Sequence, residues 1–509
     1  MSSQSRTINS ARNLIMTVGQ RLVAIILTFV GRQVFVQVLA IELLGVNSLF
    51  ADVLMILSIA DMGLATAMTY SYFKPLAEND EDKLAALSHY YNKVYKLIAL
   101  AVALIGIGLT PFLRYIINVE HPIPQIEIYY LIALASTVVS YLFVYKTIII
   151  KADQKAYITA KYRIWMSITA SILQIGVLLL TRSFLLFNIV LIFTTLGFNL
   201  LISRKANQLY PFLKRKVVLD TDDKRSVFKN IKSMIIYHTS GILFASSDTI
   251  LISVLIGTVT VGKYSNYMLA VLNLKNMCYM VFNSMSASIG NMIVKEPPKK
   301  RLQIFNAMQA LSCWLSGFVI YCSFFLLDDF VILWLGRDFV FDLPTKVALL
   351  LTAYFSILLF PTAAFRVATG MYQKSKYVMA VAAITKILLA IILGIHFGLP
   401  GILAATVISK LATYAWYEPK ILYRDFFENS STRYFIENTV NLLIVAVCII
   451  VTYYFFPWWE SSGWFEWIQK GVVYTLVINS IYFIRYFRTP EFKVITDKLM
   501  ALVMKKPAR

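Results

Sequence analysis

Charged residues are scarce in this chain. Only 15% of its 509 residues are Asp, Glu, Lys or Arg, whereas an ordinary soluble protein carries about 25%. Apolar residues make up 59% and the mean hydropathy is +0.68. Because backbone polar groups in lipid must be satisfied internally, long apolar runs of this kind are helical. The composition excludes an ordinary soluble domain and predicts an all-α polytopic membrane protein.

Acidic residues are scarcer than basic ones. There are 27 Asp and Glu against 48 Lys and Arg, a net charge of +21. In a soluble protein this excess would suggest a nucleic-acid partner. Here the basic residues lie mainly in alternate loops, as the positive-inside rule describes. The partner that the charge indicates is therefore the lipid bilayer, and we expect no nucleic-acid partner.

The residues of common catalytic and metal sites are also few. The four cysteines all lie in expected spans and lack metal-ligand spacing, which is typical of apolar packing: Cys278, Cys313, Cys322 and Cys448. No Walker loop, metal-ligand cluster or nucleophile constellation occurs in the sequence. We therefore expect no catalytic residue, no metal site, no bound cofactor and no hydrolysis of ATP.

Fourteen apolar stretches are long enough to cross a bilayer, which takes about 20 residues. The first opens after Arg12 and can span, so we expect no cleavable signal there. The expected spans are 13–39, 44–72, 90–117, 126–150, 158–181, 184–203, 232–256, 260–291, 303–327, 345–369, 377–396, 400–417, 434–456 and 470–487.

The loops between these spans predict the orientation. Every even-numbered connection carries several Lys or Arg residues, and the sixth, 204–231, is the richest. The odd-numbered connections are short and poor in basic residues, and the longest runs from about Leu326 to Thr345. The even-numbered loops and both termini are therefore expected in the cytoplasm.

An internal repeat predicts two lobes. Leu-Gly-Val-Asn-Ser at 44–48 and Val-Gly-Lys-Tyr-Ser at 261–265 lead into their helices in the same way, 217 residues apart. Gln154-Lys155-Ala156-Tyr157 and Gln373-Lys374-Ser375-Lys376-Tyr377 recur 219 residues apart. Two six-helix copies of one orientation are a common transporter plan, with cargo bound between them. The expected parts are an N-lobe at 1–203, a basic linker at 204–231, a C-lobe at 232–420, and two extra helices with a basic tail at 421–509.

One stretch resembles a known family. The residues are the Leu-Gly-Val-Asn segment at 44–47, Ala-Asp-Met-Gly-Leu at 60–64, and Lys-Pro-Leu-Ala-Glu-Asn-Asp at 74–80. They resemble the polysaccharide-transporter branch of the multidrug/oligosaccharidyl-lipid/polysaccharide exporters, which includes O-antigen and capsule-repeat flippases. The match is strongest over the first hundred residues. The resemblance implies two six-helix lobes opening as a V with two C-terminal helices, and the flipping of undecaprenyl-diphosphate-linked oligosaccharide.

The same segment also predicts local structure. Asn79 or Asp80 is well placed to cap a helix that begins with Glu81 and Asp82, because acids favour a helix N-terminus. This predicts a short surface helix at 81–90. Pro75 is expected to end the preceding helix.

Several charges interrupt the apolar helices and indicate where something polar is handled. A charge near the bilayer centre costs about 2.5–3.5 kcal/mol even on the lower scale, so such residues face a bundle interior or a cavity. Most here are cationic, which favours an anionic cargo such as a lipid diphosphate, and tyrosines can stack on sugars. The repeat aligns Tyr145-Lys146 with Phe365-Arg366. The expected substrate-binding residues are Arg32, Lys146, Lys275, Tyr279, Arg366, Lys386 and Lys410.

Two intramembrane carboxylates are candidates for H⁺ or Na⁺ coupling, Asp61 and Asp248. Several of these charges also have a structural alternative, and for Asp61 it is to order the end of its helix. Lys275 and Asp248 could form a buried pair, whereas Lys146, Lys386 and Lys410 could extend to the membrane surface.

The leading interpretation is a flippase in the bacterial inner membrane that serves surface-polysaccharide biosynthesis (O-antigen and lipopolysaccharide, capsule or exopolysaccharide). Its partners would be the lipid-linked glycan, polysaccharide polymerase and glycosyltransferases. One alternative is a cation-coupled drug or metabolite antiporter of the same superfamily, which should favour an acidic cavity. The other is a membrane polysaccharide polymerase, which usually carries a large outside loop that this sequence lacks.

Overall fold

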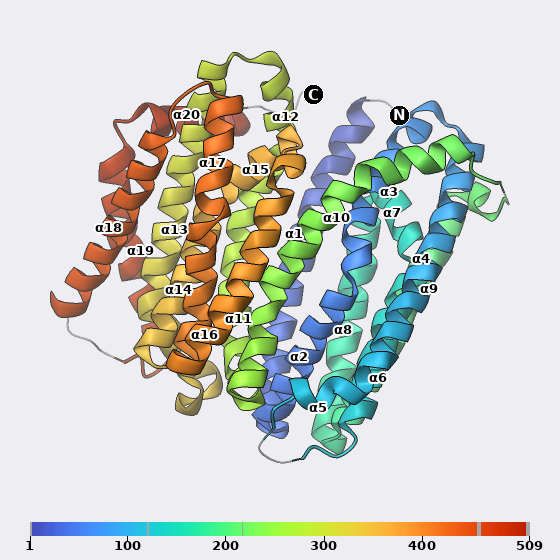
Figure 1. Cartoon of the computed structure of the whole chain (residues 1–509), viewed down its shortest axis with the longest axis horizontal. Coiled ribbons are helices and arrows are strands. Elements are labelled where there is room, and N and C mark those ends of the chain that lie inside the picture. The colour runs from blue at the N-terminus through green and yellow to red at the C-terminus, as the bar shows by residue number, and fades with distance from the viewer. Residues whose placement is uncertain (1–2, 120–121, 216, 456–459, 505–509) are drawn as a thin grey trace. The chain divides into compact units, whose positions relative to one another are not determined.

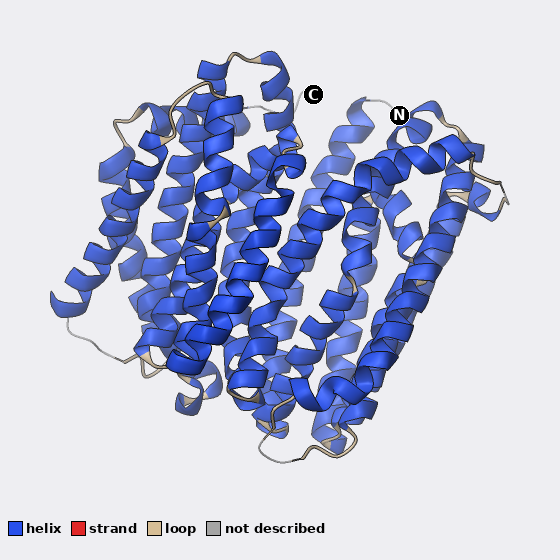
Figure 2. Cartoon of the chain, viewed as in Figure 1, coloured by secondary structure: helices blue, strands red, loops and turns tan. Residues whose placement is uncertain are grey.

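The computed structural model describes residues 3–119, 122–215, 217–455 and 460–504, and every regular element among them is a helix (Figure 2). By its internal contacts the chain divides into unit 1, Met1–Gly262, and unit 2, Lys263–Arg509.

Unit 1 is a bundle built on α1, α8 and α9. Helix α1 packs against α8, α8 against α9, and α9 against α6, while α10 packs against α2 and α3 (Figure 1). The predicted C-lobe begins at residue 232, within α10, but all of α10 belongs to unit 1. The predicted lobes therefore do not coincide with the units and remain a prediction. The helices are α1 (Ser3–Val38), α2 (Ile41–Leu57), α3 (Ile59–Glu78), α4 (Glu81–Leu109), η1 (Thr110–Phe112), α5 (Leu113–Ile116), α6 (Ile126–Tyr141), α7 (Val144–Ala152), α8 (Ala156–Thr181), α9 (Phe184–Leu209), η2 (Pro211–Lys214) and α10 (Thr221–Leu255).

Unit 2 is arranged around α13, which contacts α14, α18, α19 and α20 (Figure 1). Most residues of α13 from Phe305 to Trp334 are buried, as expected for a helix with neighbours on all sides. The helices are α11 (Thr258–Ser284, which starts in unit 1), α12 (Ser286–Lys295), α13 (Pro298–Leu335), η3 (Arg337–Phe339), α14 (Leu343–Leu358), α15 (Phe360–Thr369), α16 (Tyr372–Ala412), α17 (Tyr414–Asp425), α18 (Thr432–Phe455), α19 (Trp464–Tyr486) and α20 (Pro490–Met504).

The described helices are those of a multi-pass membrane protein. Eight are long and apolar enough to cross a bilayer, or up to ten if each of two bent pairs is one span. One of the eight, Tyr372–Asp425, is 54 residues long and includes two of the predicted spans. The predicted total of fourteen and the predicted orientation remain predictions.

Breaks in the helices follow from proline and glycine. Helices α14 and α15 meet at a bend of 40°, with Pro361 at the start of α15. Within α16, Gly398 has φ 63° and ψ −140°, so the helix is kinked there, in the predicted loop 397–400. A positive φ of this size is costly for residues with a Cβ, which explains glycine at this position.

The segment around residue 80 confirms one prediction and corrects two. Asp80 caps α4, because its carboxylate accepts the Lys83 amide at 2.9 Å. The helix it starts is not a short surface helix at 81–90, since α4 continues without a break to Leu109. Pro75 does not end its helix either. It lies in the last turn of α3, which continues to Glu78 and ends where Asn79 turns left-handed.

The two glycines of the repeat meet in unit 1. A Cβ on Gly45 of α2 would lie 1.9 Å from the Thr258 carbonyl oxygen and 3.1 Å from the Gly262 amide nitrogen. A Cβ on Gly262 would lie 2.5 Å from the Ile41 carbonyl oxygen. The start of α11 is held further by Thr258, whose amide donates to the Asn118 carbonyl at 2.9 Å. The repeated glycines therefore allow two backbones to touch.

We expect Gly45→Ala to destabilise the protein by more than the 1–3 kcal/mol or so of ordinary overpacking, because the obstacle is backbone. Gly176→Ala on α8 is the control, since a Cβ there meets nothing within 4 Å. Thermal unfolding in detergent measures both variants. Equal melting temperatures for Gly45→Ala and the wild type would contradict the close packing.

Candidate functional site

A cavity of about 200 Å³ lies within unit 1, between α1, α2, α8 and α9. Its wall includes one cation, Arg32, together with hydroxyl and amide side chains and apolar groups. None of its twelve lining residues is acidic: Leu27, Thr28, Gly31, Arg32, Phe35, Leu44, Asn47, Ser171, Gln174, Ile175, Leu178 and Phe187.

The helices around the cavity position these groups by their period. Thr28 and Arg32 are four residues apart on α1, so they lie on one face. Arg32 is half-buried. Phe35, one turn further, forms edge-to-face contacts with Phe184 and Phe187 of α9, at centroid distances of 5.9 and 5.2 Å. These rings hold α1 against α9 beside the polar part of the wall.

Lys146, the predicted counterpart of Arg366, is not among the residues that line this cavity. Its Nζ donates to Ser203 Oγ at 2.6 Å and lies 5.7 Å from the centroids of Phe143 and Tyr145. The side chain is 8% exposed, so it does not extend to the membrane surface. The alternative that Lys146 extends to the membrane surface is therefore wrong, because a hydroxyl of α9 and two rings hold the ammonium inside unit 1.

Arg366 forms a buried ion pair in unit 2. Its Nη1 lies 2.5 Å from Glu418 Oε2 of α17, and the side chains are 14% and 2% exposed. The pair joins α17 to the last turn of α15, five residues after Pro361. Glu418 directly follows the predicted span 400–417. An acid at that position was the feature of the sequence that could have indicated a partner for Arg366.

The two predicted lysines of α16 are also buried. Lys410 donates to Ser356 Oγ at 2.6 Å and to the Thr352 carbonyl at 3.2 Å, both on α14. Lys386 is fully buried, at 0% exposed. Neither lysine extends to the membrane surface, so that alternative is wrong for both. Lys410 lies between α16 and α14.

The remaining candidates are spread over both units. Tyr279 is exposed on α11 and donates to Asn283 at 3.3 Å, and Lys275, one turn before it, is half-buried. Asp248 on α10 is 6% exposed. The side chain of Asp61 lies outside the described part of the structure. The structure places Arg32 in a cavity within unit 1 and engages Lys146, Arg366 and Lys410 in contacts inside their own units.

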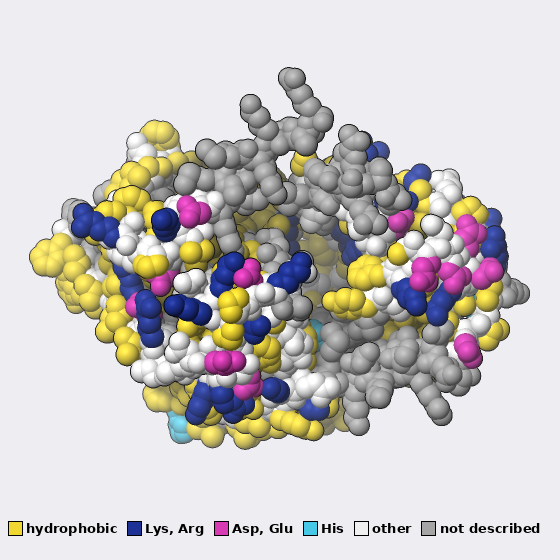
Figure 3. Space-filling model, turned by 90° about the horizontal axis from the view of Figure 1, so that it is seen from above, with side chains coloured by type: hydrophobic (Ala, Val, Ile, Leu, Met, Phe, Trp, Pro, Cys, Tyr) yellow, Lys and Arg dark blue, Asp and Glu magenta, His cyan; other side chains and the backbone are white. Residues whose placement is uncertain are grey.

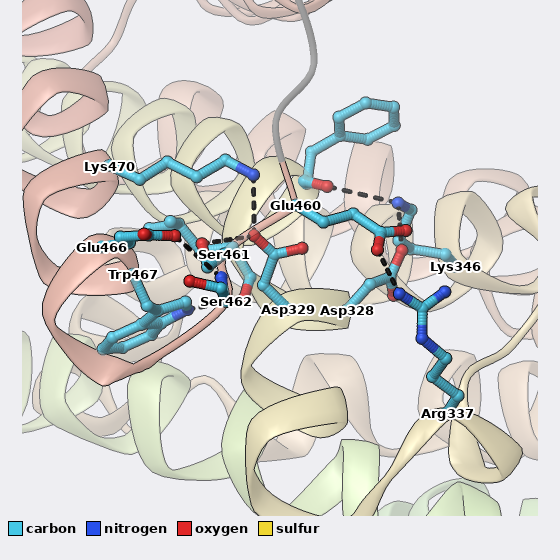
Figure 4. Close-up of polar contacts among 12 residues, drawn as sticks. Asp328, Asp329, Arg337, Lys346, Glu460, Ser461, Ser462, Glu466, Trp467 and Lys470 are labelled. Atoms are coloured by element: carbon cyan, nitrogen blue, oxygen red, sulfur yellow. Dashed lines mark hydrogen bonds and ion pairs between the residues drawn. The ribbon is translucent and has the colours of Figure 1, made fainter.

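Sequence reasoning missed a cluster of ion pairs at the end of α13 (Figure 4). Asp328 Oδ2 lies 2.6 Å from Lys346 Nζ of α14, and Asp329 Oδ2 lies 2.7 Å from Lys470 Nζ of α19. The lysine side chains are 6% and 2% exposed. The predicted span ended at residue 327, which left both aspartates in a loop. Two lysines at the starts of apolar stretches, Lys346 and Lys470, together with two adjacent acids, were the feature of the sequence that could have indicated these ion pairs.

The cluster joins five segments of unit 2. Tyr267 of α11 donates to Asp328 Oδ1 at 2.9 Å, and Ser461 donates to Asp329 at 2.8 Å. Nearby, Arg337 pairs with Glu460, as Figure 4 shows. The Ser462 amide donates to Glu466, which holds the pKa of that carboxyl below its usual range. These contacts fix the C-terminal end of α13 against α14 and α19.

No three His, Cys, Asp or Glu side chains of the described chain come together as a metal ion would require. The side chains around the cavity in unit 1 include a guanidinium, hydroxyls and amides, which are groups able to bind an anion and hydroxyl groups: Arg32, Thr28, Asn47, Ser171 and Gln174.

Comparison with solved structures shows the fold. The chain is similar to the lipid II flippase MurJ in an inward closed conformation, with a TM-score of 0.66, 15% identity, and 94% of this chain and 99% of MurJ covered. It is similar to an inward-facing multidrug resistance MATE family transporter of the MOP superfamily, with a TM-score of 0.59 and 12% identity over 86% and 96% of the two chains. It is also similar to the Vibrio cholerae MATE transporter VcmN, with a TM-score of 0.54 and 14% identity over 84% and 100%.

No family model matches the chain, and no curated protein matches it by sequence. The likeness to MurJ and the MATE transporters is therefore a likeness of fold.

Substitutions at the Arg366–Glu418 pair test its contribution to stability. Removing one partner of a buried pair typically costs 3–5 kcal/mol, so Arg366→Ala should unfold at a lower temperature. The double variant Arg366→Met with Glu418→Leu replaces both charges by apolar groups and should recover most of that stability.

Thermal unfolding in detergent is measured for the single and double variants. A double variant less stable than Arg366→Ala would contradict the pairing.

Proposed function

We propose that this chain is a flippase that moves undecaprenyl-diphosphate-linked oligosaccharide repeat units from the inner to the outer leaflet by alternating access. The cargo would serve surface-polysaccharide biosynthesis, as O-antigen, capsule or exopolysaccharide. The fold shared with the lipid II flippase MurJ supports the transport class, since a lipid-linked substrate suits that architecture. The residues resembling polysaccharide transporters support the glycan.

The observation that carries the proposal is the cavity around Arg32. A diphosphate offers several anionic oxygens, and a guanidinium pairs with them through two parallel hydrogen bonds. Hydroxyl and amide groups beside the cation suit sugar hydroxyls, and no acid among the twelve lining residues opposes an anion. Lys146, Lys275, Tyr279, Arg366, Lys386 and Lys410 remain proposed cargo contacts during the transport cycle.

The setting follows from the same proposal. The protein would lie in the bacterial inner membrane with both termini in the cytoplasm, and its predicted lobes would open as a V around the cargo. Glycosyltransferases would supply the lipid-linked unit and a polysaccharide polymerase would consume it. Proton or Na⁺ coupling would use Asp248 and Asp61.

A second candidate is a cation-coupled drug or metabolite antiporter, because two of the similar structures are MATE transporters. A site for organic cations needs carboxylates, and the twelve residues around Arg32 include none. The glycan flippase is therefore the better-supported function.

Removing the Arg32 charge tests the cargo site. A hydrogen bond to a charged group contributes about 1.5–3 kcal/mol, so Arg32→Ala should weaken cargo binding roughly 10- to 100-fold. Arg32→Lys should retain part of it, because a point charge replaces the fork. Arg114→Ala is the matched control, an exposed arginine of the same unit.

Each variant is expressed in a strain that lacks the gene, and lipid-linked glycans are quantified by mass spectrometry and by leaflet. Arg32→Ala should accumulate them in the inner leaflet, whereas Arg114→Ala should not. Wild-type export by a correctly inserted Arg32→Ala protein would remove the cargo site.

Asp248 is the described candidate for ion coupling. In proteoliposomes, we expect Asp248→Asn to transport at the basal rate and to lose stimulation by a pH or Na⁺ gradient, because the amide neither releases a proton nor balances Na⁺. Asp497→Asn, an exposed change on α20, is the control. Wild-type transport that ignores both gradients would exclude coupling.

A further inference from the structure

Two cations of unit 1 that do not line the Arg32 cavity have no acidic partner among the described residues: Lys151 of α7 and Arg163 of α8. Their surroundings are basic, since α1, α7, α8 and α9 contain arginines and lysines but no Asp or Glu. Helix α8 packs against the other three. Cations that the protein itself does not neutralise are available to an anionic ligand.

Arg163 is oriented by an aromatic ring. Its Cζ lies over the ring of Phe198 on α9, 4.4 Å from the centroid. A ring in this position covers one face of the planar guanidinium and leaves the N–H groups at its edge free to donate. The side chain is exposed, so these donors are accessible. Arg163 is therefore held ready for an acceptor from outside the protein.

Lys151 provides a second cation beside it. The residue lies in the last turn of α7 with its side chain exposed, and the like charge of Arg163 acts on its ammonium. The nearest acid along the chain is engaged elsewhere. Asp153 pairs with Lys155 at 2.6 Å and accepts from Tyr210 at 2.7 Å. A bound anion would replace the repulsion between Lys151 and Arg163 by attraction to both.

Other basic side chains at this end of unit 1 are neutralised by the protein. Acidic side chains lie among basic ones here, on the right in Figure 3. Glu81 and Asp82 each lie 3.0 Å from Arg215, which is therefore compensated. The pair of Lys151 and Arg163 differs in having two positive charges together and no acid to balance them.

This pair lies in line with the cavity around Arg32. Arg163 and Gln174 are eleven residues apart on α8, which is close to three turns, so they share a face about 16 Å apart along the axis. Both meet α9, since Arg163 lies over Phe198 and Gln174 donates to the Phe187 carbonyl at 3.5 Å. Gln174 lines the cavity. One face of α8 therefore leads from the cation pair to the cavity.

The spacing means that the two places are separate sites. The phosphates of one diphosphate share an oxygen, so a single diphosphate cannot reach across about 16 Å. The sequence predicts the cytoplasm at the turn between α7 and α8. The cation pair would then lie at the level of the inner leaflet, where lipid phosphates meet basic side chains.

We propose that Lys151 and Arg163 bind a phosphate group with at least two negative charges, carried by a lipid or by a soluble compound. Two adjacent cations are balanced by such an anion, with the fork of Arg163 and the point charge of Lys151 donating to its oxygens. In the proposed flippase, this is the first site for the diphosphate of the cargo and Arg32 is the second. That role rests on the proposed function, whereas the binding itself does not.

Binding of inorganic pyrophosphate to the full-length protein in detergent, measured by isothermal titration calorimetry, tests the soluble source. Arg163→Gln and Lys151→Gln should each weaken binding about tenfold, because each removes a charge-assisted hydrogen bond. Lys161→Gln is the matched control, an exposed lysine of α8 that points away from Arg163 because it is two residues before it. Equal affinities for the wild type and the Arg163→Gln and Lys161→Gln variants would overturn binding of the soluble anion.

Retention of phosphatidic acid, measured by native mass spectrometry against phosphatidylcholine with the same acyl chains, tests the lipid source. Arg163→Gln should lower it about tenfold and Lys161→Gln should not. Displacement of the lipid by pyrophosphate would show that both sources bind one site. Lipid retention that needs Arg163, without any pyrophosphate binding, would assign the site to lipid headgroups. If Arg163→Gln matches Lys161→Gln in both measurements, the proposal is wrong.

Arg32→Ala separates this proposal from the proposed function. Should Arg32→Ala export normally while pyrophosphate or phosphatidic acid binding still needs Arg163, the cargo cavity would be wrong and the cation pair would remain a binding site. Should Arg32→Ala block export while Arg163→Gln binds both probes like the wild type, the second site would be wrong and the cargo cavity would stand.

Discussion

A charge that is buried among apolar helices must be compensated, and this requirement organises unit 2. Isolated ions are too costly to bury, so each needs a counter-ion or several hydrogen bonds. Arg366 with Glu418, Lys346 with Asp328, and Lys470 with Asp329 each join two helices that are distant in the sequence. The charges therefore specify which helices are neighbours. Because a misplaced helix would leave a buried ion unpaired, these pairs favour one arrangement over others of similar apolar content.

Unit 1 uses its buried cations differently. Lys146 is held by a hydroxyl and two aromatic rings, and Arg32 lines a cavity whose twelve lining residues include no acid. A guanidinium beside hydroxyl and amide groups suits a phosphate and sugars, as the proposed flippase requires. In unit 2, Arg366 and Lys410 are held by partners on neighbouring helices, whereas the proposed function rests on the cavity around Arg32.

The repeat and the packing support each other at one point in unit 1. Gly45 and Gly262 hold matching positions in the predicted repeat, and each brings its helix against the backbone of the other. A match between residues 217 positions apart is expected where duplicated helices cross, since equivalent residues then meet. The kink at Gly398 and the bend near Pro361 also depend on single residues, because glycine adopts a backbone conformation closed to other residues and proline restricts its own.

The sequence by itself determined the helical class, the membrane setting, most helix positions and the cap at Asp80, because these depend on composition, period and local hydrogen bonding. It also identified Arg32, Lys146, Arg366, Lys386 and Lys410 as buried charges. Only the tertiary structure decided their partners, since Glu418, Ser203 and Ser356 are tens of residues away along the chain. It likewise decided that α4 and α13 extend beyond their apolar stretches, because a neighbouring lysine makes an aspartate such as Asp328 tolerable inside a bundle. Periodicity assigns a residue to a face, but only packing decides what that face meets.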